Sequence, residues 1–240
     1  MPNPAERLLK ILLEGKNFDN KKKCRDVWGS LLKVSPANDA LLMARLGKTM
    51  ELPLEVEAAI EEQVPGEKET QAYWIKRVSA AFKQQNLEQP WETFNKYIDE
   101  HTISYLRMAS KLLGVLSNGS SLSDEKIDEI RESISDLLSD VRGSDIAPEA
   151  KGFLVRSLQR ILLALDEYHI SGSMPILTAV ESTFGHVVIN PEFRQAVTES
   201  SLSDKIWTTL SVVASAVTVM SGVPQIAADI SNVIQALPKP

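Results

Sequence analysis

The three histidines are the side chains of this chain best suited to proton transfer or metal binding near neutral pH. His101 lies in an apolar run near Tyr105, so we expect a core imidazole that hydrogen-bonds to Tyr105 or to the backbone; the alternative is a buried ligand or base. His169 follows Asp166 by three residues, but a di-iron bundle needs such a carboxylate–histidine motif on two helices, and the sequence has no second copy. We therefore expect His169 and His186 to lie at helix ends.

Nucleophilic and cofactor-dependent chemistry has little support in the sequence. Glycine-rich phosphate loops, His-Glu-x-x-His pairs and Gly-x-Ser-x-Gly elbows are absent. Cys24 is the only cysteine, so an intrachain disulfide or a cysteine metal cluster cannot form, and no candidate base accompanies it. We expect no catalytic residue, no metal site and no cofactor.

The sharpest basic cluster comprises Lys21, Lys22, Lys23 and Arg25. It is a candidate interaction site for phosphate, in a nucleic acid or a lipid headgroup. Ordinary surface lysines are the better-supported interpretation, because no interleaved aromatic residues or wider basic face accompany the cluster. The chain carries 32 acidic and 26 basic residues, a net charge of −6. Binding of nucleic acid requires a basic surface, so we expect none.

Acidic residues follow one another at helical spacing in the middle of the chain: Asp124, Glu125, Asp128, Glu129, Glu132, Asp136 and Asp140. A calcium loop instead places its carboxylates two residues apart around a glycine turn. We therefore expect a solvated helix face, which could also serve as a docking surface for a basic partner.

Three apolar seams follow one another in the centre of the chain and predict the elements that organise it. In each seam the spacings alternate between three and four residues, which places the side chains on one stripe of an α-helix. The first seam comprises Trp91, Phe94, Ile98, His101, Tyr105, Met108, Leu112 and Val115. The second comprises Ile127, Ile130, Ile134, Leu137 and Val141. The third comprises Leu154, Leu158, Ile161, Leu165 and Tyr168.

These seams predict three long antiparallel helices that share one core. We expect Ile98 of the first seam to meet five residues of the other two seams in that core: Ile134, Leu137, Leu158, Ile161 and Leu165. No stretch alternates apolar and polar residues over the length of a strand. The chain is therefore predicted to be all-α, a multi-helix bundle of roughly ten helices around the three long ones.

Helix ends and domain boundaries follow from local signals. Asn3 and Ser123 are predicted helix caps, and Gly47 and Pro53 are predicted to separate two helices. The expected organisation has three parts: an N-terminal helical region at 1–88, a central helical bundle at 89–190, and a C-terminal apolar helical hairpin at 191–240. We expect the hairpin to pack on the bundle, unless all three parts form one domain.

The C-terminal segment carries no charged residue from 206 to 228, about 23 positions and long enough to span a bilayer. Trp207 is a candidate interfacial anchor. Small residues recur every fourth position at Ala214, Thr218 and Gly222, a pattern that lets helices approach closely in a membrane or in a soluble core. The Ser and Thr content and the break at Gly222 favour a buried core helix.

The run that begins at Ile134 and ends at Gly172 contains Ile-Ser-Asp-Leu-Leu-Ser-Asp-Val, then Ser-Asp-Ile-Ala-Pro-Glu, and finally Ile-Ser-Gly. This run resembles a pattern in bacterial all-helical proteins to which no activity is assigned. The resemblance covers under a fifth of the chain. It implies a bacterial protein, and it transfers no site residue.

Two functions are consistent with these observations. The first is a non-enzymatic bacterial helical interaction protein that contacts a protein partner or a second copy of itself. The alternative is a membrane-active effector whose segment 206–228 inserts into a bilayer on triggering. Charged residues among the leucines of the first 15 positions predict an amphipathic helix and not a signal peptide. We expect a cytoplasmic protein, with membrane association under the alternative.

Overall fold

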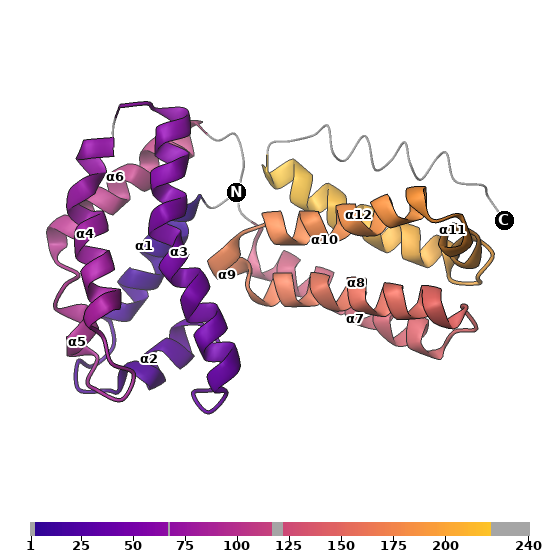
Figure 1. Ribbon diagram of the computed structural model, residues 1–240, viewed down its shortest axis with the longest axis horizontal. Coiled ribbons are helices and arrows are strands. Elements are labelled where there is room, and N and C mark those ends of the chain that lie inside the picture. The colour runs from indigo at the N-terminus through magenta and orange to yellow at the C-terminus, as the bar shows by residue number, and fades with distance from the viewer. Residues whose placement is uncertain (1–2, 67, 117–121, 222–240) are drawn as a thin grey trace. The chain divides into compact units, whose positions relative to one another are not determined.

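A computed structural model describes residues 3–66, 68–116 and 122–221 of the chain. These residues form twelve helices and no strand (Figure 1), which confirms the predicted all-α class. Backbone contacts divide the chain into two compact units. We call residues 2–118 with 169–172 the N-terminal unit, and residues 119–168 with 173–240 the C-terminal unit.

The N-terminal unit contains six of the helices: α1 (Pro4–Lys16), α2 (Cys24–Leu31), α3 (Asp39–Gln63), α4 (Lys68–Gln84), α5 (Glu92–Asn95) and α6 (Glu100–Leu116). The side chain of Asn3 accepts a hydrogen bond from the backbone N–H of Glu6 and caps α1 as predicted. Helix α1 packs on α2, α3 and α6, and α4 packs on α3, α5 and α6. The unit is therefore built around α1 and α6.

Helix α3 continues through both of its predicted breaks. The backbone at Gly47 stays helical, which costs up to about 1 kcal/mol relative to alanine. Pro53 lacks the N–H that would bond one turn back, yet α3 runs on to Gln63 because Leu52, Val56 and Ile60 are all buried. The expectation of two helices separated by Gly47 and Pro53 was wrong, since tertiary burial outweighs the local signals.

An aromatic cluster forms part of the core of the N-terminal unit. The Trp28 ring centroid lies 5.8 Å from that of Phe82, 5.2 Å from that of Trp91 and 5.0 Å from that of Phe94. Trp91 donates its indole N–H to the carbonyl of Gly15 at 2.9 Å. Because the indole hydrogen bond is satisfied inside the unit, the ring can be buried without loss of a polar contact.

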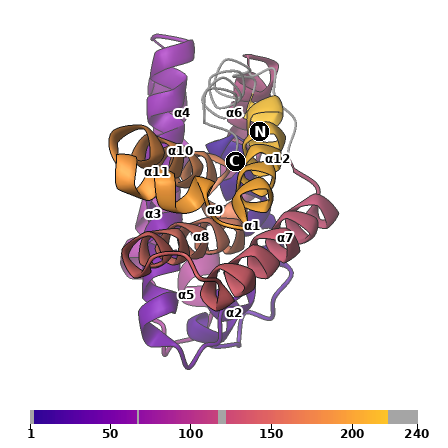
Figure 2. The ribbon, with the colours of Figure 1, turned by 90° about the vertical axis from the view of Figure 1, so that its right-hand side faces the viewer.

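The C-terminal unit contains α7 (Asp124–Gly143), α8 (Pro148–Asp166), α10 (Met174–Ile189), α11 (Pro191–Thr198) and α12 (Ser203–Ser221). Between α8 and α10 lies the short α9 (Tyr168–Ser171), whose residues after Tyr168 belong to the N-terminal unit. Helix α8 packs on α7 and α10, and α12 packs on α10 and α7. These four long helices thus form a closed bundle, with α10 beside α8 and α12 beside α7 (Figures 1 and 2).

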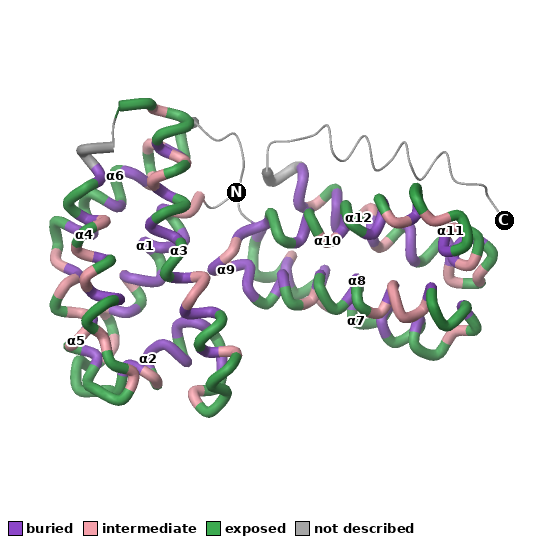
Figure 3. The backbone as a smooth tube through the Cα atoms, in the orientation of Figure 1, coloured by how far each residue is buried: buried purple, intermediate pink, exposed green. Residues whose placement is uncertain are grey.

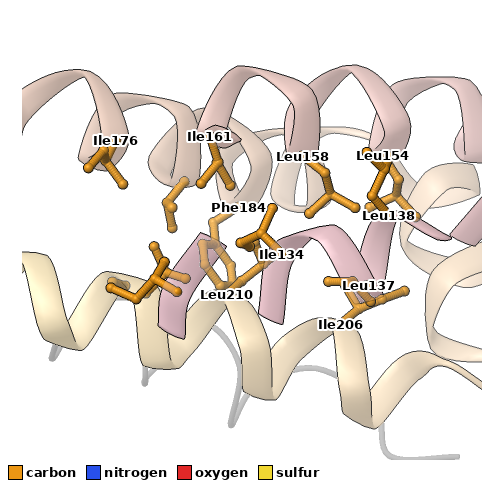
Figure 4. Packing of buried hydrophobic residues seen from close by; sticks show 14 of the residues in the cluster. Ile134, Leu137, Leu138, Leu154, Leu158, Ile161, Ile176, Phe184, Ile206 and Leu210 are labelled. Carbon is orange, nitrogen blue, oxygen red and sulfur yellow. The ribbon is translucent and has the colours of Figure 1, made fainter. Parts of the chain in front are cut away.

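The second and third seams are confirmed as core. Every residue of both seams is buried in one cluster with side chains from α10 and α12 (Figure 4). Ser123 accepts a hydrogen bond from the backbone N–H of Lys126 and caps α7, as predicted. Ile98, which we expected in this core, is instead buried in the separate core of the N-terminal unit.

The first seam does not form one continuous buried face. Helix α5 ends at Asn95 and α6 begins at Glu100. Asp99 caps α6, because its carboxylate accepts a hydrogen bond from the Thr102 backbone N–H at 2.7 Å. This interruption changes the register, so α6 buries a different set: Ile103, Leu106, Ala109 and Leu113. Met108 is 62% exposed and Val115 is 83% exposed. The prediction that they pack in the core was wrong. Buried and exposed positions alternate along the tube of α6 (Figure 3).

The division by contacts also differs from the expected boundary between residues 88 and 89. Helix α6 packs on α1, α3 and α4, so the first seam belongs with the N-terminal helices. Helix α12 packs on α10 and α7 within the C-terminal unit, so the contacts set no boundary at residue 191. The second helix of the predicted C-terminal hairpin lies at 222–240, outside the described residues.

Candidate functional site

The predicted basic cluster is partly neutralised by carboxylates from distant positions in the chain. Lys23 Nζ lies 3.2 Å from a Glu88 carboxylate oxygen, and Arg25 Nε lies 2.7 Å from the other. Arg25 also pairs with Asp39. These hydrogen bonds lower the pKa of the Glu88 carboxyl and raise that of the Arg25 guanidinium.

The two remaining cations of the cluster are exposed. Lys22 Nζ lies 5.3 Å from the centroid of the Phe18 ring, within cation–π range. Because Lys23 and Arg25 are paired with carboxylates, only Lys21 and Lys22 offer charge to a phosphate. Two adjacent lysines are fewer than the four to eight cations typical of a lipid-headgroup site.

The predicted C-terminal residues lie in a helix that is built into the core. Trp207, Ala214 and Thr218 are buried, and the Thr218 hydroxyl donates to the Ala214 carbonyl at 2.8 Å. The Trp207 ring centroid lies 5.8 Å from that of Phe184 on α10. Gly222 lies outside the described residues. Within the described ranges, no helix is long and apolar enough to cross a membrane.

The sequence singled out four side chains for chemistry, the three histidines and Cys24, and the structure places them on four different helices: His101 on α6, His169 on α9, His186 on α10 and Cys24 on α2. His101 is exposed on α6, so the expected core imidazole was wrong; its ring centroid lies 6.5 Å from that of Tyr73. His186 stacks on Phe153 with ring centroids 3.8 Å apart. Cys24 is buried, and burial raises the pKa of its thiol. A raised pKa leaves little thiolate at neutral pH, so Cys24 is not an activated nucleophile.

The acidic face of α7 is exposed, opposite the second seam, as expected. Some of its carboxylates are paired: Asp128 with Arg131, and Asp140 with Lys205. Among the described residues, no group of three or more metal-binding side chains lies close enough together to hold an ion.

A hollow of about 600 Å³ lies between the turn after α7 and helix α11. It is lined by Ser144, Asp145, Ile146, Ala147, Glu192, Gln195, Ala196, Glu199, Ser200 and Ser201. Its carboxylates are all exposed, and Glu199 accepts a hydrogen bond from the Gln195 amide. The carboxylates would attract a cation, but their exposure weakens any such contact.

The most distinctive surface is the part of the first seam that the fold leaves outside. We call His101, Tyr105, Met108, Leu112 and Val115 the α6 stripe. Four of these side chains are exposed, and Leu112 is half-buried. Their alternating spacing of four and three residues keeps them on one face of α6, away from the face that packs on α1, α3 and α4. The α6 stripe therefore has the pattern of a packed helix face, yet most of its side chains are exposed.

Tyr73 of α4 widens the α6 stripe. Its ring centroid lies 5.7 Å from that of Tyr105, and its hydroxyl donates to Asp99 at 2.8 Å. Arg77 Nε lies 3.3 Å from the same carboxylate. Burial raises the pKa of Asp99, but hydrogen bonds from Thr102 and Tyr73 and the charge of Arg77 outweigh it and hold that pKa at about 2. The hydrogen bond to Asp99 thus holds Tyr73 beside Tyr105 at the edge of the stripe.

The charges beside the α6 stripe are positive. Arg107 and Lys111 are exposed along one edge, and neither has an ion-pair partner among the described residues. The nearest acidic residue on the helix, Glu100, lies 3.1 Å from Lys16 Nζ and is already paired. An apolar stripe with unpaired cations is unusual in a chain whose net charge is −6.

The five residues of the α6 stripe were all part of the first seam, which was predicted to pack in the core; Tyr73, Arg107 and Lys111 were not identified from the sequence. The missed signal is Asp99, whose carboxylate can accept a hydrogen bond from the backbone three residues later and so start a helix in the middle of the seam.

Comparison with protein-family models, with curated proteins and with solved structures gives no match for this chain.

Proposed function

We propose that this protein is a non-enzymatic interaction protein that binds an amphipathic helix of a protein partner on its α6 stripe. The observation that carries the proposal is the exposure of an apolar helix face with the spacing of a packed one. Grooves and faces that accept helical partners present anchors at such spacings, because facing helices interdigitate at every third and fourth residue.

The apolar area supports a specific contact. Met108 and Val115 are more than half exposed, and Tyr105 and Tyr73 add two aromatic rings at 38% and 42% exposure. Full burial of one such side chain contributes on the order of 1.5–3 kcal/mol. Tyrosine and methionine are also enriched where proteins bind partners, since tyrosine combines a large apolar ring with a hydroxyl, and methionine adapts its shape.

The charges indicate the character of the partner. Arg107 and Lys111 would lie at the rim of a helix docked on the α6 stripe. Rim charges contribute little to affinity but steer association and reject partners of like charge. They therefore favour a partner helix whose apolar face is flanked by Asp and Glu.

A synthetic peptide tests the proposal. The probe is a helical peptide of about three heptads with Leu at the a and d positions and Glu at the flanking e and g positions. A second peptide has Lys at the flanking positions. Fluorescence anisotropy of each labelled peptide is measured against the full chain, and against the variants Met108→Asp and Leu163→Asp. Leu163 is the matched control, because it is 48% exposed on α8 in the other unit.

We expect the Glu-flanked peptide to bind more tightly than the Lys-flanked one, by about tenfold or more at low salt. Met108→Asp should abolish binding, and Leu163→Asp should leave it unchanged. Equal binding of both peptides, or binding that survives Met108→Asp, would contradict the proposal.

The membrane-active alternative has a distinct readout. If segment 206–228 or the basic residues beside the α6 stripe engaged lipid, the full chain should bind vesicles that contain phosphatidylserine. If Met108→Asp abolishes vesicle binding and neither peptide binds the chain, the α6 stripe binds a membrane surface and not a helical partner. Because Trp207, Ala214 and Thr218 are buried, a trigger would have to release α12 before it could insert into a bilayer.

A further inference from the structure

A second apolar stripe lies on α3 of the N-terminal unit. Met43 is 55% exposed, Met50 is 44% exposed and Leu54 is 63% exposed. Gly47 lies between the two methionines, so the spacings are four, three and four residues. We call these four residues the α3 stripe. The opposite face of α3 carries its buried residues: Leu42, Arg45, Leu46, Thr49, Leu52, Pro53, Val56 and Ile60.

The charges around the α3 stripe are the reverse of those around the α6 stripe. Glu51 follows Met50 directly, and Glu61 and Glu62 continue along the helix. All three are exposed, and none has an ion-pair partner among the described residues. Helix α3 thus exposes an apolar stripe that has carboxylates beside it, which is the kind of surface that the α6 stripe favours in a partner.

We propose that the α3 stripe of one copy of this chain binds the α6 stripe of a second copy. This inference rests on the proposed function and names the partner. The α6 stripe runs from His101 to Val115 and the α3 stripe from Met43 to Leu54, which is roughly 21 Å and 17 Å at the helical rise. A Cβ placed at Gly47 would meet nothing within 4 Å, so the middle of the α3 stripe has space for a large side chain of the facing helix.

Charge selects this pairing over the two symmetric ones. Two α6 stripes packed together would bring Arg107 and Lys111 of one copy beside those of the other. Two α3 stripes packed together would bring Glu51 of one copy beside Glu51 of the other. Like charges at an interface are unfavourable, whereas the mixed pairing, with the two helices parallel, places the edge of α6 that carries Lys111 beside the edge of α3 that carries Glu51.

The contact joins two different surfaces, so each copy keeps one free stripe after a single contact forms. Both stripes can be satisfied at once in a closed dimer, or copies can add head to tail. Since one helix pair buries less area than a standard interface, the association should be weak, with a dissociation constant in the micromolar range or above. Rim charges should also make it weaker at high salt.

Sedimentation velocity of the full chain over a range of concentrations tests the proposal, with Met50→Lys and Met108→Asp as paired variants. Met50→Lys places a cation opposite Arg107 and Lys111, and Met108→Asp places a carboxylate opposite Glu51. Both changes lie at exposed positions, so each variant should unfold at the same denaturant concentration as the wild type. That control separates loss of association from loss of folding.

We expect the wild type to sediment faster as its concentration rises, and each variant alone to remain monomeric. An equimolar mixture of the two variants should form a one-to-one complex, because the intact α3 stripe of Met108→Asp can bind the intact α6 stripe of Met50→Lys. This recovery is specific to contact between the two different stripes.

Three results would overturn the inference: a wild type that is monomeric at every concentration, self-association of Met50→Lys alone, and a mixture of variants that stays monomeric. The proposed function is tested separately by the peptides. If the chain is monomeric but still binds the Glu-flanked peptide, the α6 stripe is an interaction surface whose partner is not a second copy of this chain.

Discussion

The α6 stripe and the seams of α7 and α8 have the same residue spacing but opposite positions in the fold. In α7 and α8 one apolar face meets its neighbours, and all ten seam residues are buried. Helix α6 has two apolar faces: one is buried on α1, α3 and α4, and the other is exposed. The comparison shows that a spacing of three and four identifies a helix face suited to packing, whereas burial depends on how many such faces the unit can cover.

The largest expected difference between the two regions is in stability. Ile161→Ala should lower the free energy of unfolding by about 2–4 kcal/mol, since Ile161 is completely buried in the third seam. Leu163→Ala is the matched control two residues away, at a side chain that is 48% exposed, and should cost less than about 1 kcal/mol. Urea denaturation of the three proteins checks this; equal losses would place Ile161 outside a packed core.

Overpacking in α12 should give the next largest effect. Ala214 lies on α12 and its side chain is only 1% exposed, so the larger side chain of Ala214→Leu should destabilise the protein by roughly 1–3 kcal/mol. Val212→Leu adds a methylene on the same helix at a side chain that is 50% exposed, where we expect no measurable change. Thermal melting distinguishes the two, and a fully stable Ala214→Leu would remove the evidence that α12 is a core helix.

Much of the fold follows from local pattern. The seams of α7 and α8 and the caps Asn3 and Ser123 were predicted because each depends on residues within one or two turns. The register of α6 was not predicted, because the helix start at Asp99 divides the seam. The continuity of α3 through Pro53 depends on burial that only the tertiary structure supplies.

The candidate site was the least predictable part, for a related reason. Glu88 is 63 residues from Arg25, so no local pattern shows that the basic cluster is neutralised. The residues of the α6 stripe were all identified, yet a sequence does not state which of two apolar faces is covered. The α3 stripe was hidden because Gly47 and Pro53 were read as the ends of two short helices.

A smaller effect is expected at the start of α6. Asp99→Ala removes the cap and should cost about 1 kcal/mol. The folded-state pKa of about 2 lies below the ordinary value of 3.8, so the charged carboxylate stabilises the fold above that ordinary value, and this contribution is lost as the pH falls toward 2. The difference between the wild type and Asp99→Ala should therefore shrink between pH 5 and pH 2.

Urea denaturation at several pH values measures that difference. Asp145→Ala is the control, because Asp145 is exposed and lies outside the helices; its effect should stay within about 0.5 kcal/mol at every pH. A difference for Asp99→Ala that grows on acidification would show that the carboxylate does not stabilise the start of α6.

The central claim, that the α6 stripe faces outward while the seam of α8 is core, is tested most directly by thiol labelling of Met108→Cys and Ile161→Cys. Cys24 is buried and serves as an internal protected thiol. The experiment uses dilute protein in the Met50→Lys background, so that self-association cannot shield residue 108. The account predicts that Met108→Cys reacts in the native protein almost as fast as in denaturant, and that Ile161→Cys is slower by at least about a hundredfold, because opening a core position costs several kcal/mol. Equal protection of the two thiols would contradict it.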